Sequence, residues 1–309
     1  MKVLVTGGAG FIGSHVVDGL IKGGHKVVVV DNLSTGFLDN IHPDASFYQI
    51  DIRDPGLAGV FEKEKPDIVN HHAAQISVRV SLQDPPQDAQ INVLGSLNVI
   101  ECCKNYGVKK VIYISTGGAV YGEPKYLPCD ENHPIDPLCP YGVTKHTVEH
   151  YLFLYNRLFG LKYTVLRYPN VYGPRQDPYG EAGVVAIFTR QMLKDQQAVI
   201  NGTGDQERDF VYVADVVRAN ILAMKNGACG IFNVGWGRGA SVNQIFQTLA
   251  SITGYTRKPV HQEAIPGEVF KICLDATKAR KELGWIPQTD LEDGMRYTVE
   301  YFKAKQDQG

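Results

Sequence analysis

Short apolar runs rich in β-branched residues alternate with longer amphipathic stretches over the first 170 residues. The short runs are too brief for helices, and turn residues follow each of them. They predict strands at residues 3–5, 27–30, 47–50, 68–70, 111–114 and 164–166. The longer stretches predict helices at residues 12–22, 56–64, 89–105 and 141–159. This alternation predicts an α/β fold with a doubly wound, parallel Rossmann sheet, because right-handed crossovers place helices on both faces.

The pattern changes after residue 170. Gly, Pro and Tyr cluster at 168–183, and shorter elements follow. We expect helices at 187–194, 216–225, 276–282 and 291–303, and strands at 198–200 and 210–213. Residues 1–170 are thus expected to form a dinucleotide-binding domain, and residues 171–309 a smaller α/β substrate-binding domain. The two are expected to interleave, because an apolar run at 231–234 has the character of a strand that returns to the main sheet.

Composition narrows the classes of function. The formal charge is −2, so there is no basic excess with which to hold nucleic acid or an anionic membrane. No apolar run approaches the length of about 18 residues that a membrane span needs. The six Cys contain no CxxC pair, which argues against a disulfide framework or a zinc site. A cytoplasmic protein without a signal peptide is therefore expected.

A glycine-rich turn, residues 6–13, follows the first expected strand and opens the first helix. Gly8, Gly10 and Gly13 fit the GxGxxG spacing, and Gly7 replaces Gly8 in the related GxxGxxG spacing. Glycines permit a tight turn and let a pyrophosphate approach the backbone, while the helix N-terminus offers free N–H groups. Its placement between strand and helix favours a dinucleotide site over a turn without a ligand.

Asp31 ends the second expected strand, eighteen residues after Gly13. An acid at this place accepts hydrogen bonds from the adenosine ribose, and its charge repels a 2′-phosphate. We therefore expect NAD rather than NADP. Asp51, just past the third expected strand, is expected to face the adenine.

Tyrosine and lysine stand four residues apart at Tyr106/Lys110, Tyr121/Lys125, Tyr141/Lys145 and Tyr301/Lys305. Only the third pair begins a helix in the middle of the chain, with a proline ahead of it as a start signal. The spacing puts both side chains on one helix face. An ammonium near a phenol lowers the pKa of the phenol, so Tyr141 and Lys145 are the candidate proton-transfer pair.

The fifth expected strand ends in Ser115 and Thr116, at the sheet edge where ligands bind in open α/β folds. Either hydroxyl is a catalytic candidate; the alternative is a turn residue that bonds its own backbone. His71 and His72 are expected to line the cofactor pocket or to pack. No metal is expected, since no Cys or carboxylate stands at ligand spacing from them.

The motifs, in their order along the chain, resemble those of the extended short-chain dehydrogenase/reductase family, closest to the UDP-glucose 4-epimerases. The resemblance covers almost the whole chain. It rests on TGGAGFIG at 6–13, DNLSTG at 31–36, HHAAQ at 71–75, Asn92, AVYG at 119–122, YGVTK at 141–145, RYPNVYGPR at 167–175 and RDFVYVADV at 208–216.

The resemblance implies epimerisation of a UDP-hexose at C4, which interconverts UDP-glucose and UDP-galactose through a 4-keto intermediate. Tyr141 as phenolate takes the proton of the 4-hydroxyl while hydride passes to NAD, and hydride then returns to the other face. Lys145 holds the nicotinamide ribose and keeps Tyr141 acidic. The alternatives are a UDP-N-acetylglucosamine or UDP-glucuronate 4-epimerase, a sugar-nucleotide reductase, and a non-catalytic NAD-sensing scaffold.

The resemblance also implies binding positions and an assembly. Cofactor positions are Gly7, Gly10, Phe11, Ile12, Gly13, Asp31, Asn32, Ser34, Thr35, Gly36, Asp51, Ile52, Ala73, Ala74, Gln75, Asn92, Ser115, Tyr141, Lys145 and Tyr168. Positions for the sugar nucleotide are Thr116, Tyr141, Asn170, Val184, Val185, Val199, Ile200, Asn201, Arg208 and Glu268. The helices at 89–105 and 141–159 match the pair that forms the dimer interface in relatives, so a homodimer is expected.

Three departures from the family pattern stand out. Many epimerases carry Ser or Thr where this chain has Gly117, so the hydroxyl near Tyr141 must come from Thr116 or Ser115, or be absent. Many carry Arg where this chain has Ile265, so one diphosphate contact is missing. The position that gates N-acetylated sugars falls on Ile272. Related dehydratases and decarboxylases carry acids at the strand end, which lacks them here.

Overall fold

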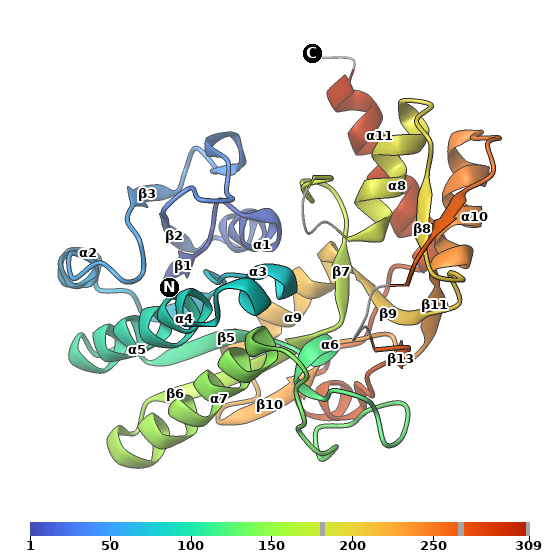
Figure 1. Ribbon diagram of the computed structural model, residues 1–309. Coiled ribbons are helices and arrows are strands. Elements are labelled where there is room, and N and C mark those ends of the chain that lie inside the picture. Colours follow the sequence, from blue (N-terminus) through green and yellow to red (C-terminus); the bar gives the residue numbers. More distant parts are fainter. Residues whose placement is uncertain (180–182, 265–268, 307–309) are drawn as a thin grey trace.

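The computed structural model describes residues 1–179, 183–264 and 269–306. Seven parallel strands form its central sheet, in the order β10–β6–β5–β4–β1–β2–β3 (Figure 1). The strands are β1 (Lys2–Thr6), β2 (Lys26–Asp31), β3 (Ser46–Gln49), β4 (Ile68–His71), β5 (Lys110–Thr116), β6 (Lys162–Tyr168) and β10 (Gly230–Asn233). The expected α/β fold class with a doubly wound Rossmann sheet is therefore confirmed.

Helices cover both faces of this sheet, and each face has its own apolar core. α1 (Phe11–Lys22) and α9 (Val213–Lys225) pack on one face. α2 (Leu57–Glu64), α5 (Ser96–Asn105) and α7 (Pro140–Phe159) pack on the other. Because both faces are buried, the central strands are continuously apolar instead of alternating between apolar and polar residues.

The ends of β1 and β4 define the ligand-binding edge of the sheet. Val3 and Val5 of β1 contribute to the core under α1, and Leu4 contributes to the opposite core, since successive strand side chains alternate between faces. The strand order turns between β1 and β4. Ligands in open α/β sheets bind at such a switch point, beyond the carboxyl ends of the strands.

The segment between β4 and β5 differs from the single helix expected at 89–105. It contains α3 (Val78–Gln83), α4 (Pro85–Ala89) and a π-helical stretch, η2 (Gln90–Gly95), which continues into α5. Periodicity of apolar residues does not distinguish a π-turn from an α-turn, so the sequence could not reveal it. Such turns are frequent at functional sites, and this one carries Asn92.

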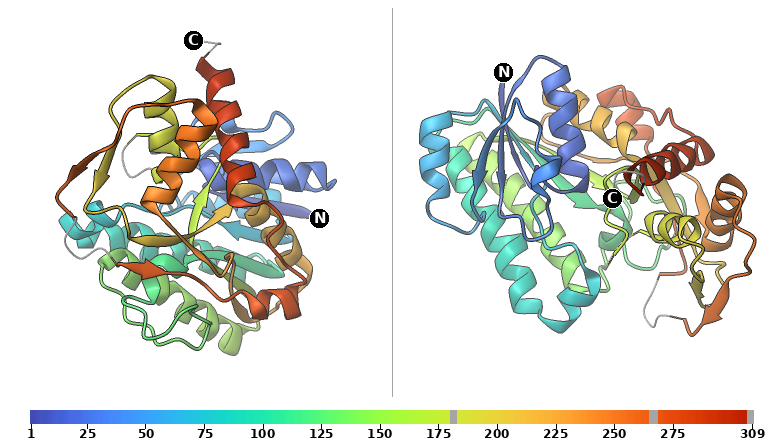
Figure 2. Two further views of the ribbon diagram at one scale, coloured as in Figure 1. Left: turned by 90° about the vertical axis from the view of Figure 1, so that its right-hand side faces the viewer. Right: turned by 90° about the horizontal axis from the view of Figure 1, so that it is seen from above.

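The C-terminal part builds a second group of small sheets and helices. At its centre, β9 (Glu207–Tyr212) pairs with three short strands, β7 (Asn170–Tyr172), β11 (Gly239–Ser241) and β13 (Lys271–Ile272). A separate pair joins β8 (Val199–Asn201) to β12 (Val260–Gln262). Three helices enclose a third core at one end of the molecule (Figure 2): α8 (Val184–Leu193), α10 (Val242–Thr253) and α11 (Leu291–Gln306).

Two C-terminal elements differ from the expectations. α10 was not predicted, although Ser241 and Gln244 form a capping box at its start: Ser241 Oγ accepts from the Gln244 N–H at 3.1 Å, and Gln244 Oε1 accepts from the Ser241 N–H at 2.8 Å. The helix expected at 276–282 ends as a π-turn, η3 (Ala279–Leu283). Smaller elements complete the chain: α6 (Gly117–Val120) and η1 (Leu38–Asn40).

Candidate active site

The glycine-rich turn after β1 has no room for side chains. Gly7 has φ +70°, and a Cβ there would lie 2.6 Å from the Ala73 nitrogen. A Cβ on Gly13 would lie 2.1 Å from the Gly7 carbonyl oxygen. Gly10 caps α1 without any side-chain cap, so no side chain covers the N–H groups of the first turn. This bare, N–H-rich turn fits the pyrophosphate of a dinucleotide.

Asp31 lies beside the glycine turn at the end of β2. It is buried, and its two carboxylate oxygens accept from the N–H groups of Ala9 at 3.0 Å and Leu33 at 2.8 Å. The following loop, which carries Ser34 and Thr35, returns to the same turn: a Cβ on Gly36 would lie 2.8 Å from Ala9 Cβ. The acid is thus held at the place where an adenosine ribose would meet the sheet edge.

Asn32 and Asp51 lie together on the surface next to this acid. The Asn32 amide donates to Asp51 at 2.9 Å, and Arg53 donates to the same carboxylate twice from its side chain and once from its backbone N–H. The hydrogen bonds from Arg53 lower the pKa of Asp51. Ile52, expected at the cofactor, is buried in the core beside Gly95.

A chain of hydrogen bonds through His71 connects β1, β4 and the π-helical stretch. Thr6 Oγ1 accepts from the Ala73 N–H at 3.2 Å and lies 2.6 Å from His71 Nδ1. On the other side, His71 Nε2 lies 2.9 Å from Ser96 Oγ, which donates to the Asn92 carbonyl. Because the Ser96 proton is used on Asn92, Nε2 of His71 donates to Ser96 Oγ, and Nδ1 of a neutral ring accepts from the Thr6 hydroxyl. Burial agrees, since it lowers the pKa of His71 to about 3.

The amide of Asn92 ties the loop after β4 to helix α7. Its oxygen accepts from the Gln75 N–H at 2.8 Å, and its nitrogen donates to Asp88 at 3.0 Å. Asp88 is fully buried and also accepts from the Thr144 hydroxyl at 2.6 Å. This network fixes residues 73–75, which include the cofactor candidates Ala73, Ala74 and Gln75, against the first turn of α7.

Tyr141 and Lys145 lie at the N-terminal end of α7, beyond the end of β5. Burial raises the pKa of Tyr141, and a hydrogen bond with the Thr116 side chain opposes that shift. Lys145 is 4% exposed, and its ammonium lies 4.4 Å from the centroid of the Tyr113 ring. Burial lowers the pKa of Lys145 to about 7. The Tyr141 phenol and the Thr116 hydroxyl thus meet at the ligand-binding edge, and the buried Lys145 ammonium lies against Tyr113, one helical turn further along α7.

Ser115 and Thr116 have different surroundings, although both were catalytic candidates. The Ser115 hydroxyl donates to the buried Glu149 at 2.5 Å, below the sheet edge. Thr116 is the neighbour of Tyr141. The sequence contained a signal for this difference, because adjacent strand residues point to opposite faces.

The candidates for sugar-nucleotide binding spread over the C-terminal part. The Asn170 side chain lies near Thr116: a Cβ on Gly118 would be 4.0 Å from Asn170 Oδ1 and 3.8 Å from Thr116 Oγ1. Arg208 on β9 donates to the carbonyls of Glu207 and Phe270. Glu268 and Ile265 lie outside the described residues. Of the remaining candidates, Val185 and Ile200 are core residues, and Val184, Val199 and Asn201 are half-buried.

Tyr168 lies deeper than the other cofactor candidates. It is buried in the core under α1, and its hydroxyl accepts from the Asn220 amide at 2.6 Å. Phe11 and Ile12 are half-buried in the first turn of α1.

Three buried acids escaped the sequence analysis. Asp88 and Glu149 approach the Tyr141–Lys145 pair from α4 and α7, and both oppose the lowering of the Lys145 pKa. Asp209, beside Arg208, accepts from the N–H groups of Trp236, Gly237 and Leu274. In a sequence, a buried acid of this kind shows itself only as an acidic residue where the helix pattern calls for an apolar one. Of the three, Glu149 gave such a signal, because it stands four residues after Lys145 on the same helix face.

Within residues 1–179, 183–264 and 269–306, no group of three or more His, Cys, Asp or Glu is placed to hold a metal ion. No helix in that part of the chain is long and apolar enough to cross a bilayer.

Comparison with known proteins places these features in a family. Residues 3–235 match the NAD dependent epimerase/dehydratase family. A UDP-glucose 4-epimerase of Mycolicibacterium smegmatis is 42% identical over 311 residues, which cover 99% of each chain. The crystal structure of the Thermotoga maritima UDP-glucose 4-epimerase with UDP-glucose has a TM-score of 0.98 at 53% identity, covering 99% of this chain and 100% of that one. The Thermus thermophilus UDP-glucose 4-epimerase in complex with NAD has a TM-score of 0.93 at 43% identity, covering 98% and 99%. The chain belongs to the NAD-dependent epimerase/dehydratase family.

Proposed function

We propose that this protein is a UDP-glucose 4-epimerase, which interconverts UDP-glucose and UDP-galactose with a retained NAD. The observation that carries the proposal is Tyr141, hydrogen-bonded to Thr116 at the end of β5, with the buried Lys145 one helical turn later on α7. Relatives that are similar over nearly the whole chain carry this activity in their names, which supports it further.

The residues at the switch point suit NAD. The bare turn at Gly7, Gly10 and Gly13 would hold the pyrophosphate, and Asp31 would accept from the adenosine ribose. The carboxylate would also repel a 2′-phosphate, which favours NAD over NADP. Bound NAD supplies a reversible hydride acceptor for C4 of the sugar.

Proton transfer falls to Tyr141. Its phenol would take the proton of the sugar 4-hydroxyl and return it, and the Thr116 hydroxyl is placed to share a hydrogen bond with both. Burial alone opposes ionisation of the phenol, so a nearby positive charge is needed. Lys145 would supply that charge and would hold the nicotinamide ribose.

The end of β5 argues against a second chemical step. Gly117 and Gly118 follow Thr116 directly, so neither position carries an acid or base for water elimination or decarboxylation. A cycle that ends at epimerisation needs only the Tyr141–Lys145 pair.

The C-terminal part would hold the sugar nucleotide. We assign residues 1–170 to the dinucleotide unit, with β10 completing its sheet, and residues 171–309 to the sugar-nucleotide unit. Asn170 and Arg208 are the proposed diphosphate contacts, since an amide and a guanidinium both donate to phosphate oxygens.

We also propose a homodimer in a reducing, cytoplasmic setting. Helix α7 exposes five apolar side chains: Val143 (49%), Phe153 (39%), Leu154 (37%), Leu158 (68%) and Phe159 (53%). Apolar surface of this kind marks an interface. A second α7 with the neighbouring α5 would cover it, and analytical ultracentrifugation tests the assembly. The six free Cys suit a reducing compartment.

The test of function is direct. The purified protein is incubated with UDP-galactose without added cofactor, and ¹H NMR follows the sugar while mass spectrometry identifies the dinucleotide released on denaturation. We expect UDP-glucose to form and NAD to be released. NADP as the main dinucleotide, or a steady build-up of NADH, would contradict the proposal. If the protein converts UDP-N-acetylgalactosamine and not UDP-galactose, the substrate is the N-acetylated sugar nucleotide.

A further inference from the structure

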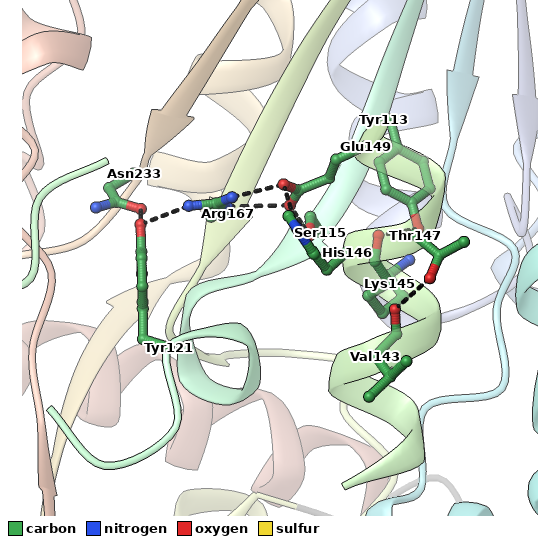
Figure 3. Close-up of polar contacts among 10 residues, drawn as sticks. All are labelled: Tyr113, Ser115, Tyr121, Val143, Lys145, His146, Thr147, Glu149, Arg167 and Asn233. Atoms are coloured by element: carbon green, nitrogen blue, oxygen red, sulfur yellow. Dashed lines mark hydrogen bonds and ion pairs between the residues drawn. The ribbon is translucent and has the colours of Figure 1, made fainter. Parts of the chain in front are cut away.

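Helix α7 and strand β5 meet through four side chains in the region of Lys145. Lys145 and Glu149 are four residues apart on α7, and Tyr113 and Ser115 are two apart on β5, so each pair shares one face. The Lys145 ammonium lies 4.4 Å from the centroid of the Tyr113 ring, and the Ser115 hydroxyl donates to Glu149 at 2.5 Å (Figure 3). The Glu149 carboxylate is therefore fixed one helical turn from Lys145.

A buried ion pair holds this carboxylate from the other side. Arg167 donates to both Glu149 oxygens, at 3.0 and 2.6 Å, and each side chain is 2% exposed or less. Arg167 also donates to the Tyr121 hydroxyl at 2.9 Å, which donates to Asn233 at 2.8 Å. In the view of Figure 3, Glu149 lies between Arg167 and Lys145.

The carboxylate carries its charge at neutral pH. Burial alone would raise the pKa of Glu149, but hydrogen bonds from His146, Arg167 and Ser115 lower it to about 2. A buried ion pair contributes little to net stability, because desolvation offsets the attraction. The position of the Glu149 carboxylate beside Lys145 instead indicates an electrostatic effect on that lysine.

We propose that Glu149 is a positioning residue, whose fixed negative charge strengthens proton binding by Lys145 and so increases the charged share of this lysine at neutral pH. This inference rests on the proposed function, in which Lys145 must be charged to activate Tyr141 and to hold the nicotinamide ribose.

Of the titratable groups around Lys145, the acids supply the negative charge that favours its protonated form. His71, the last residue of β4, and His72, which follows it, face Lys145, and burial lowers the pKa of both to about 3, so they are neutral. From β5, the ring of Tyr113 faces Lys145, and Tyr141 lies one helical turn before it on α7; burial raises the pKa of both phenols. Glu149 and, from α4, Asp88 supply negative charge.

Burial strips water from Lys145 and lowers its pKa to about 7, and the two acids oppose this shift. The ammonium is therefore close to losing its proton under physiological conditions. Asp88 is engaged by Thr144, Gln75 and Asn92, which belong to the loop network. Glu149 is the acid on the same helix as Lys145, and Arg167 holds it from the side opposite Lys145.

The test is a titration of Lys145 by NMR in the protein labelled with ¹³C at lysine Cε, with the resonance assigned by its absence from Lys145→Met. We expect a midpoint near pH 7 in the wild type. In Glu149→Gln the midpoint should fall by roughly one pH unit, a change of about tenfold in the ratio of charged to neutral lysine. Glu149→Asp should restore most of the difference.

Asp215→Asn is the matched control, because Asp215 is an equally buried acid, paired with Arg218 on α9. It should leave the Lys145 midpoint unchanged. If Glu149→Gln does not fold, Glu149→Gln with Arg167→Met removes both charges of the pair. The midpoint should still fall, but by less, because loss of the Arg167 cation opposes the effect of losing Glu149. An unchanged midpoint in the folded variant overturns the inference.

Activity separates this inference from the proposed function. In an active enzyme, Glu149→Gln should move the alkaline limb of kcat/KM to lower pH by the same amount as the NMR midpoint. A limb that stays in place while the midpoint moves would overturn the role in positioning. An inactive wild type whose Lys145 midpoint responds to Glu149→Gln would refute the epimerase function and leave the charge coupling established.

Discussion

Gly117 packs directly against Leu274: a Cβ on Gly117 would lie 2.4 Å from Leu274 Cδ1. Leu274 is fully buried, and its backbone N–H is bound by Asp209 at 3.2 Å, so it cannot move aside without cost. This contact gives a physical reason for the missing hydroxyl at the end of β5. The side chain of the later segment occupies the space that a serine would need.

The contact predicts an asymmetry between two adjacent glycines. Gly117→Ser should lower the free energy of unfolding by about 1–3 kcal/mol through overpacking. Gly118→Ser is the matched control, since the atoms nearest to its Cβ would be 3.8 and 4.0 Å away. Urea denaturation of both variants measures the difference. Adding Leu274→Ala should relieve the Gly117→Ser strain; equal costs at both glycines would contradict the contact.

Tyr141→Phe should abolish most turnover without loss of bound dinucleotide. The substitution removes only the hydroxyl, and loss of a general base costs roughly 10²–10⁴-fold in rate. Steady-state kinetics on UDP-galactose, with mass spectrometry of the released dinucleotide, measure both effects. Tyr155→Phe, on the same helix with its hydroxyl on Glu101, is the control and should keep wild-type rates. Near-normal turnover by Tyr141→Phe would remove it from the mechanism.

Loss of the Thr116 hydroxyl should affect the rate of reaction, and loss of the Ser115 hydroxyl should affect stability. Thr116→Ala should lower kcat at least about tenfold, because it removes the hydroxyl next to Tyr141, and Thr116→Ser should recover much of the rate. Ser115→Ala should instead lower stability by about 1.5–3 kcal/mol, the range for a hydrogen bond to a charged group. Kinetics and urea denaturation of the three variants provide the readout. The opposite pattern would assign the catalytic hydroxyl to Ser115.

Local patterns predicted the parts of the site that lie next to one another in sequence. The glycine turn follows β1 immediately, and Tyr141 and Lys145 share one helix face, so spacing alone indicates both. The partners of Lys145 could not be found this way. Asp88 reaches Lys145 through tertiary contacts, and Glu149, although four residues later on the same helix face, is fixed there by Arg167 and Ser115 from other elements. The choice between Ser115 and Thr116 depends on how α7 crosses the end of β5.

The fold shows the same limit. Long buried strands and most amphipathic helices were predicted because burial imposes their periodicity, although α10 was missed. The short strands β7, β11 and β13 exist only because they pair with β9, and each has three residues or fewer. Such segments carry no pattern of their own, so the architecture of the C-terminal part could be expected only in outline.

Asp209→Asn should destabilise the protein although it removes a buried charge. The carboxylate accepts three backbone N–H groups, from Trp236 on one oxygen and from Gly237 and Leu274 on the other. An amide has one oxygen, so in either orientation its NH₂ faces at least one donor. We expect a loss of about 1–3 kcal/mol in urea denaturation. Asp290→Asn, an exposed acid paired with Arg238, should cost far less; similar costs would contradict this reasoning.

His71 should make the protein sensitive to acid. Its pKa is about 3 in the folded protein, below the usual 6.5, so the unfolded chain binds more protons between these values. The stability due to neutral His71 is fully present above pH 6.5 and is lost as pH falls towards 3, by up to about 1.4 kcal/mol per pH unit.

Urea denaturation of wild type and His71→Gln between pH 7 and 4.5 measures this dependence. The variant should be less stable at pH 7, because Thr6 and Ser96 lose a partner, but its stability should fall less steeply with acid. His150→Gln, on the exposed side of α7, should keep the wild-type slope. Parallel slopes for all three proteins would show that His71 does not titrate on unfolding.

The pairing of β10 with β6 has a consequence for synthesis of the chain. β6 ends at Tyr168, but its outer neighbour is completed only at Asn233, about 65 residues later. While the intervening residues are being made, one edge of the nearly finished sheet shows the unpaired N–H and C=O groups of β6 to other nascent chains. A ribosome that stalls in this interval, or a gene cut after residue 170, would release a sheet with an open, apolar edge. The later half of the protein thus protects the earlier half from aggregation, independently of any ligand that it binds.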